Sequence, residues 1–332
     1  MESLTGKQPV GNRHFRQSSS LKAADDAGPD PSAAGRRTLN KVSRDTWLWR
    51  GTQMTVIDRL RYDGKRVLVV GGATGMGAAA AKSAGELGAE VVVIDYAPID
   101  YEVAQALQVD LRDPASIDSV LEQLDGPVHA VFSAAGVAGG PDLMKINFIG
   151  HRYVIERLLD KGQLPSGSAI CFISSVAGMG WENNLPLLLE FLATPDYAAA
   201  QDWVSAHEAE GIIHYGFSKK VVNAYVATQA YPLLKKGIRI NAICPGPTDT
   251  PLAQANADMW LTFAQDYRDE TGSKVHTPEQ MGDVMAFLNS AAAFGISGIT
   301  LLVDYGHTMA SLTGAYPPGK PIIDLIMGRV AL

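Results

Sequence analysis

The sequence predicts an α/β fold, a doubly wound parallel sheet of about seven strands with helices on both faces. From residue 63 onward, short runs rich in Val and Ile alternate with stretches whose apolar residues recur at helical spacing. The runs are apolar throughout, which is typical of strands that are buried on both faces of a parallel sheet. No repeat or linker interrupts this alternation, so we expect residues 54–332 to form a single domain.

Each expected strand is a short run rich in β-branched residues, and each expected helix follows with its own apolar periodicity. The expected strands are Val67–Val70, Val91–Asp95, Ala106–Asp110, Val128–Ser133, Ala169–Ser174, Arg239–Cys244 and Ile299–Val303. The expected helices are Gly75–Leu87, Pro114–Leu124, Leu143–Leu159, Tyr215–Leu234 and Pro278–Leu288. Because helical crossovers join these strands, parallel pairing is expected throughout the sheet.

Two segments depart from this alternation. Residues 1–53 are rich in Ser, Gly, Pro, Asp and Arg, so we expect a disordered extension that cannot bury enough apolar surface to fold. It is either a regulatory tail or a stretch foreign to the native protein, because Met54 stands where the composition changes. The second segment is an apolar insertion at residues 176–212, which is expected to be helical. It must pack on the core, on a partner subunit or over a ligand.

The composition narrows the class of partner. The 332 residues include 28 basic and 35 acidic side chains, and this net charge of −7 argues against general binding to nucleic acid or anionic membranes. No apolar stretch approaches the roughly 18 residues of a membrane span, and the N-terminus lacks an apolar signal region. The two cysteines, Cys171 and Cys244, lie in expected strands, which favours free thiols and a cytoplasmic location.

A glycine cluster between the first strand and the first helix predicts a phosphate-binding loop. Gly71, Gly75 and Gly77, with Thr74 and Met76 between them, lie where a tight turn brings backbone N–H groups and a helix N-terminus to an anion. Such a loop in an alternating α/β chain is typical of a Rossmann-type fold that binds a dinucleotide.

Two acids follow at the ends of the next two strands. Asp95 lies 18 residues after Gly77, where a carboxylate can hold both ribose hydroxyls of NAD. It would repel the 2'-phosphate of NADP, and residues 96–98 supply no Arg or Lys to offset it, so NAD is the expected cofactor. Asp110, followed by Leu111, either accepts from the adenine amino group or is an ordinary turn or N-cap acid.

Tyr215 and Lys219 are the expected acid–base pair. Four residues apart on a helix, they lie on one face. A free tyrosine has a pKa near 10, and a neighbouring ammonium group is expected to lower that pKa toward the range useful for proton transfer. Three histidines, at positions 151, 207 and 214, show no metal-ligand spacing, so no metal site is expected.

The order of these motifs resembles the short-chain dehydrogenase/reductase family over about residues 63 to 310. The motifs are the glycine loop, Asp95, Ser175, Tyr215 with Lys219, and the segment from Asn241 to Gly246. The resemblance implies that Tyr215 is the acid–base group, Lys219 binds the nicotinamide ribose, Ser175 orients the substrate oxygen and Asn147 supports a proton-relay water. It also implies cofactor contacts from a further set of residues: Ala135, Gly136, Tyr215, Lys219, Pro245, Gly246, and Thr248 or Thr250.

Some assignments have alternatives. Ser174 competes with Ser175, Asn147 is alternatively a polar residue that satisfies backbone groups, and His214 either lines the site or caps the helix. The sequence also departs from the family pattern, with Val70 where Thr is usual and Ser133 at the start of a segment that is usually Asn-Asn-Ala-Gly. These departures put cofactor affinity and local stability in doubt more than the chemistry.

The spacing of the site narrows the expected substrate. Ser175 and Tyr215 are 40 residues apart, a longer gap than is usual in the family, and this layout resembles bacterial 3α-hydroxysteroid dehydrogenase/carbonyl reductases and coniferyl-alcohol dehydrogenases. The expected activity is NAD(H)-dependent interconversion of a bulky hydrophobic secondary alcohol, a hydroxysteroid, with its ketone. The alternatives are an aromatic alcohol dehydrogenase of the coniferyl type and a non-catalytic NAD-binding sensor.

The same resemblance implies a homo-oligomer. Family members commonly form tetramers through the helices that carry Asn147 and Tyr215, so a homotetramer is expected, or a homodimer if the insertion blocks that interface. We also expect residues 253–271, with part of the insertion, to form a substrate lid, with an interface or extra core as the alternative.

Overall fold

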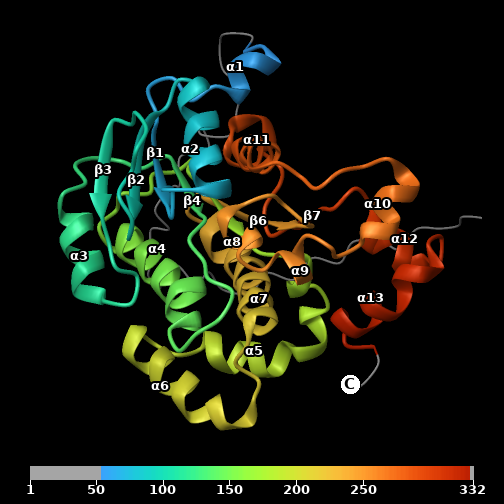
Figure 1. Cartoon of the computed structure of the whole chain (residues 1–332). Helices are drawn as coiled ribbons and strands as arrows, with labels where there is room; N and C mark the ends of the chain where they lie inside the picture. Colours follow the sequence, from blue (N-terminus) through green and yellow to red (C-terminus); the bar gives the residue numbers. More distant parts are fainter. Residues whose placement is uncertain (1–53, 330–332) are drawn as a thin grey trace, which may run out of the picture. The chain divides into compact units, whose positions relative to one another are not determined.

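A seven-stranded parallel sheet organises the chain, in a computed structural model that describes residues 54–329. The strand order is β3-β2-β1-β4-β5-β6-β7, which confirms the predicted doubly wound α/β fold (Figure 1). The strands are β1 Arg66–Val70, β2 Glu90–Asp95, β3 Gln105–Gln108, β4 Ala130–Ser133, β5 Ala169–Ile173, β6 Arg239–Pro245 and β7 Thr300–Val303. The expected disordered extension at residues 1–53 lies outside the described residues.

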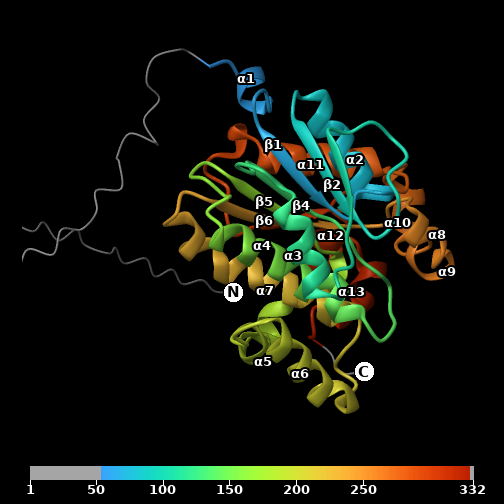
Figure 2. The same cartoon turned by 90° about the vertical axis from the view of Figure 1, so that its left-hand side faces the viewer.

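Helices cover both faces of this sheet (Figure 2). On one face, α2 (Gly75–Glu86) and α11 (Pro278–Asn289) pack together through Ala80, Ala84, Met281 and Met285. On the other face lie α3 (Pro114–Glu122), α4 (Gly150–Asp160) and α7 (Tyr215–Leu234), which enclose a larger apolar core. No helix among residues 54–329 is both long enough and apolar enough to cross a membrane.

The ends of the predicted strands and helices agree with the structure to within two residues, with one difference in helix type. The expected helix at 143–159 begins as a π-helical turn, η2 (Lys145–Ile149), before it continues as α4. Apolar periodicity cannot distinguish this turn from an α-helix, because the one-residue expansion leaves the buried face nearly unchanged. The turn carries Asn147, as π-helical turns at functional sites often carry key residues.

The insertion forms two helices that pack on the sheet-covering layer. They are α5 (Leu185–Leu192) and α6 (Tyr197–His207), joined to β5 by the short turns η3 (Val176–Gly178) and η4 (Trp181–Asn184). Phe191 is fully buried, and its ring lies 5.7 Å from Phe148 of η2 and 6.4 Å from Phe217 of α7, between ring centroids. Arg152 of α4 donates to the Thr194 carbonyl at 2.6 Å. The insertion therefore packs on α4 and α7, which favours the extra-core alternative for this segment.

The chain between β6 and β7 contains three short helices besides α11: α8 (Pro251–Gln254), α9 (Ala257–Trp260) and α10 (Gln265–Thr271). After β7 it continues through α12 (His307–Thr313) and α13 (Lys320–Ile326), while α1 (Val56–Leu60) precedes β1. Strand β1 pairs with β2 on one side and with β4 on the other, so the direction in which strands are added to the sheet reverses at β1. At such a switch point the loops after the two strands separate and leave a crevice at the carboxyl edge of the sheet.

Candidate active site

The glycine loop after β1 is shaped by close backbone contacts. Gly71 has a φ of +86°, and a side chain there would collide with the backbone of Ala135 in the loop after β4. A side chain on Gly77 would collide with the carbonyl oxygen of Gly71. Because only glycine tolerates both arrangements, the loop lies flat against the start of α2, where backbone N–H groups of a helix N-terminus attract an anion.

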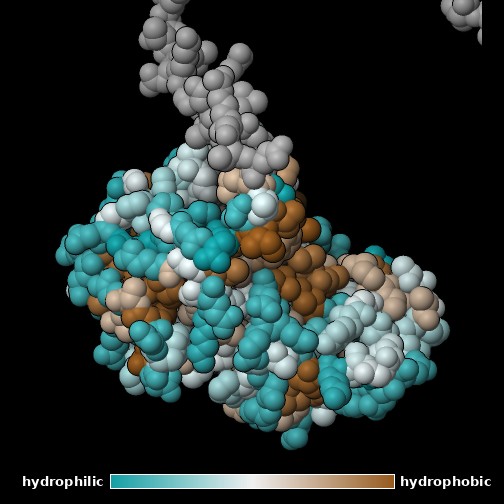
Figure 3. All heavy atoms as spheres, turned by 90° about the horizontal axis from the view of Figure 1, so that it is seen from above, coloured by the Kyte–Doolittle hydropathy of each residue, from teal (hydrophilic) through white to brown (hydrophobic). Residues whose placement is uncertain are grey.

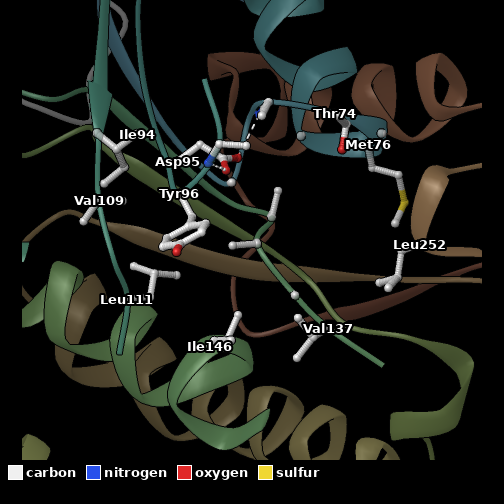
Figure 4. A pocket seen from close by; sticks show the side chains of 18 of the residues that line it. Thr74, Met76, Ile94, Asp95, Tyr96, Val109, Leu111, Val137, Ile146 and Leu252 are labelled. Atoms are coloured by element: carbon white, nitrogen blue, oxygen red, sulfur yellow. Dashed lines mark hydrogen bonds between the residues drawn. The ribbon is translucent and has the colours of Figure 1, made fainter. Parts of the chain in front are cut away.

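Asp95, at the end of β2, holds this loop in place. One carboxylate oxygen accepts from the backbone N–H of Ala73 at 2.8 Å, and the other accepts from the backbone N–H of Ala97 at 2.9 Å. Figure 4 shows the carboxylate on the wall of a pocket between the loop and β2. Its position beside the glycine loop is the one expected of a ribose-binding carboxylate.

A cavity of about 470 Å³ opens at the switch point, beside these groups. It is large enough for part of a dinucleotide, since ligand pockets are typically about 300–1,000 Å³. Eleven of the sequence-predicted cofactor residues line it: Gly71, Thr74, Gly75, Met76, Gly77, Asp95, Asp110, Leu111, Ala135, Gly136 and Thr250. The lining does not include five other predicted cofactor residues: Tyr215, Lys219, Pro245, Gly246 and Thr248. The Thr248 hydroxyl donates to the Gly246 carbonyl at 3.0 Å, as in an ordinary turn.

Arg112 is a cavity residue that the sequence reasoning missed. Its guanidinium donates to both carboxylate oxygens of Asp110, at 2.7 Å for the closest pair, and lies 5.3 Å from the ring centroid of Tyr96. The ion pair lowers the pKa of Asp110, chiefly through these side-chain hydrogen bonds. Asp110 also accepts from the Arg112 N–H at 2.9 Å, which agrees with the turn alternative, and Asp113 is the N-cap of α3. Residues 96–98 contain no cation, but the chain after β3 brings Arg112 beside Tyr96, a contact that adjacency in the sequence does not indicate.

Lys219 and Tyr215 lie together at the start of α7. The ammonium group of Lys219 is 5.4 Å from the Tyr215 ring centroid and donates to the Ile173 carbonyl, at the end of β5, at 3.0 Å. Gly136 lies beside the same ammonium, since a Cβ added to this glycine would be 3.9 Å from Lys219 Nζ. Gly136 also lines the cavity, so the cavity and the tyrosine–lysine pair meet at this glycine.

Asn147, on the π-helical turn η2, connects the loop after β4 to α7 near Gly136 and Lys219. Its amide nitrogen donates to the Val137 carbonyl at 3.0 Å and to the Ser218 hydroxyl at 3.1 Å, and its oxygen accepts from the Val137 N–H at 2.8 Å. Both amide hydrogens are therefore used, which favours a bracing role between the β4 loop and α7. A contact between Asn147 and a relay water would have to use the second lone pair of its side-chain oxygen or its backbone.

The two serines after β5 have different surroundings. Ser174 is buried, and its hydroxyl donates to the Lys219 carbonyl at 3.1 Å, so it holds α7 against the sheet. Ser175 is more accessible, and its hydroxyl accepts from the Ala177 N–H at 3.2 Å and, from beside Tyr215, lowers the pKa of that tyrosine. This contact favours Ser175 as the site serine. His214 accepts from the Phe217 N–H at 3.3 Å and caps α7, in agreement with the capping alternative.

The pKa of Tyr215 is shifted in the direction opposite to the expected one. Burial raises the pKa of Tyr215 to about 12, against a smaller lowering by the Ser175 hydrogen bond, although a lowered pKa was expected beside Lys219. Burial also lowers the pKa of Lys219 to about 8. The expectation was wrong because it counted the attraction between the two groups and not the loss of water around both. Here each group is pushed toward its neutral form.

The lysine pKa predicts a pH dependence of stability. Because the pKa of Lys219 is about 8 in the folded protein and 10.5 ordinarily, the unfolded chain binds more protons between these pH values. The unfolding free energy of the wild type should therefore rise by about 3 kcal/mol relative to Lys219→Met as pH increases across that window. Chemical denaturation at several pH values measures the difference. Lys235→Met, an exposed change just after α7, should retain the wild-type profile, and parallel curves for the wild type and Lys219→Met would contradict the prediction.

Trp260 of α9 covers Tyr215. The two ring centroids are 4.9 Å apart, with planes tilted by 42°. Met259 and Trp260 both lie in the expected lid segment, residues 253–271, and the sequence does not indicate which of them faces the site. Met259 is 74% exposed, so Trp260 is the inward-facing one.

Comparison with known proteins agrees with this geometry. The family model described as short chain dehydrogenase matches residues 65–186, and a model described as enoyl-(acyl carrier protein) reductase matches residues 197–308. A coniferyl-alcohol dehydrogenase from a Pseudomonas species is 27% identical, over 74% of this chain and 98% of its own length. A 3-alpha-hydroxysteroid dehydrogenase/carbonyl reductase from Comamonas testosteroni is 28% identical, over 72% and 95%.

Two further matches cover similar lengths. A cis-4-hydroxycyclohexanecarboxylate dehydrogenase from Sinomonas cyclohexanicum is 31% identical, over 74% of this chain and 97% of its own. Among solved structures, a 3-ketoacyl-(acyl-carrier-protein) reductase from Brucella melitensis, complexed with NADH, aligns with a TM-score of 0.55 at 22% identity, over 74% and 98%. The motif order, the parallel sheet and these matches agree, and the chain belongs to the short-chain dehydrogenase/reductase family of oxidoreductases.

Proposed function

We propose that this protein is an NAD(H)-dependent oxidoreductase that interconverts a bulky hydrophobic secondary alcohol, a hydroxysteroid, with its ketone. The observation that carries the proposal is the junction at Gly136. There the cavity reaches Lys219 of the tyrosine–lysine pair, and the Ser175 hydroxyl lies beside Tyr215. A group that binds the substrate oxygen and a group that moves its proton are thus next to the place where a hydride carrier fits.

The roles of the four residues follow from these contacts. In the oxidation direction, the Ser175 hydroxyl holds the alcohol oxygen and the Tyr215 phenolate accepts its proton. Lys219 stabilises that phenolate by its charge, and Asn147 keeps the β4 loop and α7 at a fixed spacing around Lys219. A bound NAD supplies the hydride acceptor. In the ketone-reducing direction, the neutral Tyr215 that burial favours is the proton donor.

Asp95 supports NAD over NADP as the cofactor. A carboxylate among the backbone donors of the glycine loop is suited to ribose hydroxyls and repels a 2'-phosphate. Arg112 does not reverse this preference, because its guanidinium is already paired with Asp110. We therefore expect Asp95→Ser to lower the ratio of kcat/KM for NAD to that for NADP by roughly tenfold or more, since hydrogen bonds to a charged group contribute about 1.5–3 kcal/mol.

Steady-state kinetics with both cofactors measures this ratio. Asp100→Ser, on the loop between β2 and β3 and outside the cavity lining, is the control that should leave the ratio unchanged. If Asp95→Ser kept the wild-type ratio of kcat/KM for NAD to that for NADP, Asp95 would not determine the choice of cofactor.

The proposed class of substrate is supported by the position of Trp260 beside Tyr215 and by the named substrates of similar proteins. Relatives at 27–31% identity are named for a coniferyl alcohol, a hydroxysteroid and a hydroxycyclohexanecarboxylate, all of which contain a ring. An aromatic alcohol of the coniferyl type is the second candidate, because Trp260 places an aromatic surface beside Tyr215. The direct test mixes the protein with NAD and a panel of hydroxysteroids, cyclic alcohols and aromatic alcohols, and follows NADH absorbance. NADH binding without any turnover across the panel would contradict the proposal and favour a sensor.

We also propose that the protein is a cytoplasmic homodimer. The insertion helices occupy the outer side of α4 and α7, which supports a dimer over a tetramer formed through those helices. Apolar side chains gather on the face seen in Figure 3, and Phe287 of α11 and Ile299 beside the edge strand β7 are each 39% exposed. Exposed apolar groups of this kind commonly mark a protein interface.

Both cysteines are buried free thiols, which suits a reducing compartment. Light scattering on the purified protein tests the dimer.

A further inference from the structure

Trp260 is the residue of the expected lid segment, residues 253–271, whose ring contacts a ring of the candidate active site. Helix α9 spans only four residues and none of them is buried, yet the Trp260 ring lies 4.9 Å from the ring of Tyr215. The indole therefore packs against the phenol from the segment after β6, at the first residue of α7. A substrate whose oxygen is held by Ser175 and Tyr215 has this indole as a neighbouring apolar surface.

Both ends of the segment are anchored. On the N-terminal side, Thr250 caps α8 by accepting from the Ala253 N–H at 3.1 Å, and Ala253 is buried. On the C-terminal side, the buried Arg268 donates to the Leu261 carbonyl at 2.6 Å and to the Phe263 carbonyl. Trp260 lies between these two buried residues, so its indole is held beside Tyr215.

We propose that Trp260 is the specificity-determining residue of this site and selects ring-bearing secondary alcohols and ketones over open-chain ones. The proposal rests on the proposed function and deepens it. A cyclic substrate that packs against the indole loses little conformational entropy, because the torsions within its ring are already fixed. An open chain with the same number of carbons must freeze several torsions to cover the same surface. The preference therefore arises from the flat surface and fixed position of Trp260.

Steady-state kinetics with cyclohexanol and 2-hexanol tests the proposal. In Trp260→Ala, the ratio of kcat/KM for cyclohexanol to that for 2-hexanol should fall by roughly tenfold, the usual scale for loss of an apolar pocket contact. Trp260→Phe should retain most of the ratio, because it keeps a flat ring. Met259→Ala is the matched control on the same helix, since its side chain is 74% exposed, and it should leave the ratio unchanged. An unchanged ratio in Trp260→Ala, or an equal fall in Met259→Ala, would overturn the proposal.

A binding measurement separates this proposal from the proposed function. The protein contains five tryptophans, and labelling them with 5-fluorotryptophan gives fluorine resonances of which the Trp260 signal is the one lost in Trp260→Phe. In the Tyr215→Phe protein with NADH, cyclohexanone should shift the Trp260 signal, and 2-hexanone should shift it less at equal concentration. A shift without turnover by the wild type would retain the ring site and reject the oxidoreductase activity. No shift up to the solubility limit of cyclohexanone would reject the ring site, whatever the turnover.

Discussion

Replacement of Tyr215 by Phe is expected to lower kcat at least about a hundredfold, the usual contribution of a positioned acid–base group. The change removes only the hydroxyl, so the Tyr215 ring contacts with Trp260 and Lys219 are retained. NADH affinity should stay close to the wild-type value, because the cavity lining does not include Tyr215. Stopped-flow or steady-state rates, combined with NADH fluorescence titration, measure both quantities on the same protein.

Tyr231→Phe is the matched control for this prediction. Tyr231 lies on the same helix, and its side chain is 74% exposed, so removal of its hydroxyl should change neither kcat nor NADH affinity. If Tyr215→Phe turned substrate over at the wild-type rate, proton transfer through Tyr215 would be excluded. A loss of NADH binding in parallel with kcat would instead point to a disturbed fold.

The second large effect is expected from Phe191→Ala. Phe191 is fully buried in the insertion, and its ring is 5.7 Å from Phe148 and 5.0 Å from Trp203, between centroids. Removal of a buried aromatic ring from such a site should lower the free energy of unfolding by about 3–5 kcal/mol. That is a large fraction of the roughly 5–15 kcal/mol that stabilises a typical native protein. Denaturant titration at a temperature where the variant is still folded measures the change.

The same variant distinguishes extra core from lid. Because the insertion packs on α4 and α7, kcat/KM for an apolar alcohol should be retained in the folded fraction of Phe191→Ala. Leu189→Ala, at a position 42% exposed on the same helix, should change the unfolding free energy by less than about 1 kcal/mol. Full stability combined with a loss of kcat/KM in Phe191→Ala would mean that the insertion acts over the substrate.

Several features of the site were predictable because they depend on local sequence. Gly71 and Gly77 follow an apolar run and open a helix, and Asp95 ends the next strand, so their proximity follows from the geometry of one β-α-β unit. Tyr215 and Lys219 share a helix face through their spacing alone. The insertion at 176–212 was visible as an apolar interruption, and its helices were expected, although the surface that they cover was not.

Other features depend on where distant segments meet. Arg112 reaches Tyr96 only because β3 pairs with β2, and Trp260 reaches Tyr215 only because the segment after β6 folds back over α7. The Asn147 side chain is occupied by Val137 and Ser218, contacts that its own helix does not specify. The direction of the Tyr215 pKa also depends on burial by several segments, which a neighbouring lysine in the sequence does not indicate.

The sequence by itself thus determined the α/β class, the family, the glycine loop and the candidate catalytic residues, because these depend on periodicity and short spacings along one chain. The tertiary structure decided which serine contacts Tyr215, which surface the insertion covers, which aromatic ring lies over Tyr215 and how the tyrosine and lysine are tuned. These depend on contacts between segments far apart in the sequence and on the water that such contacts exclude.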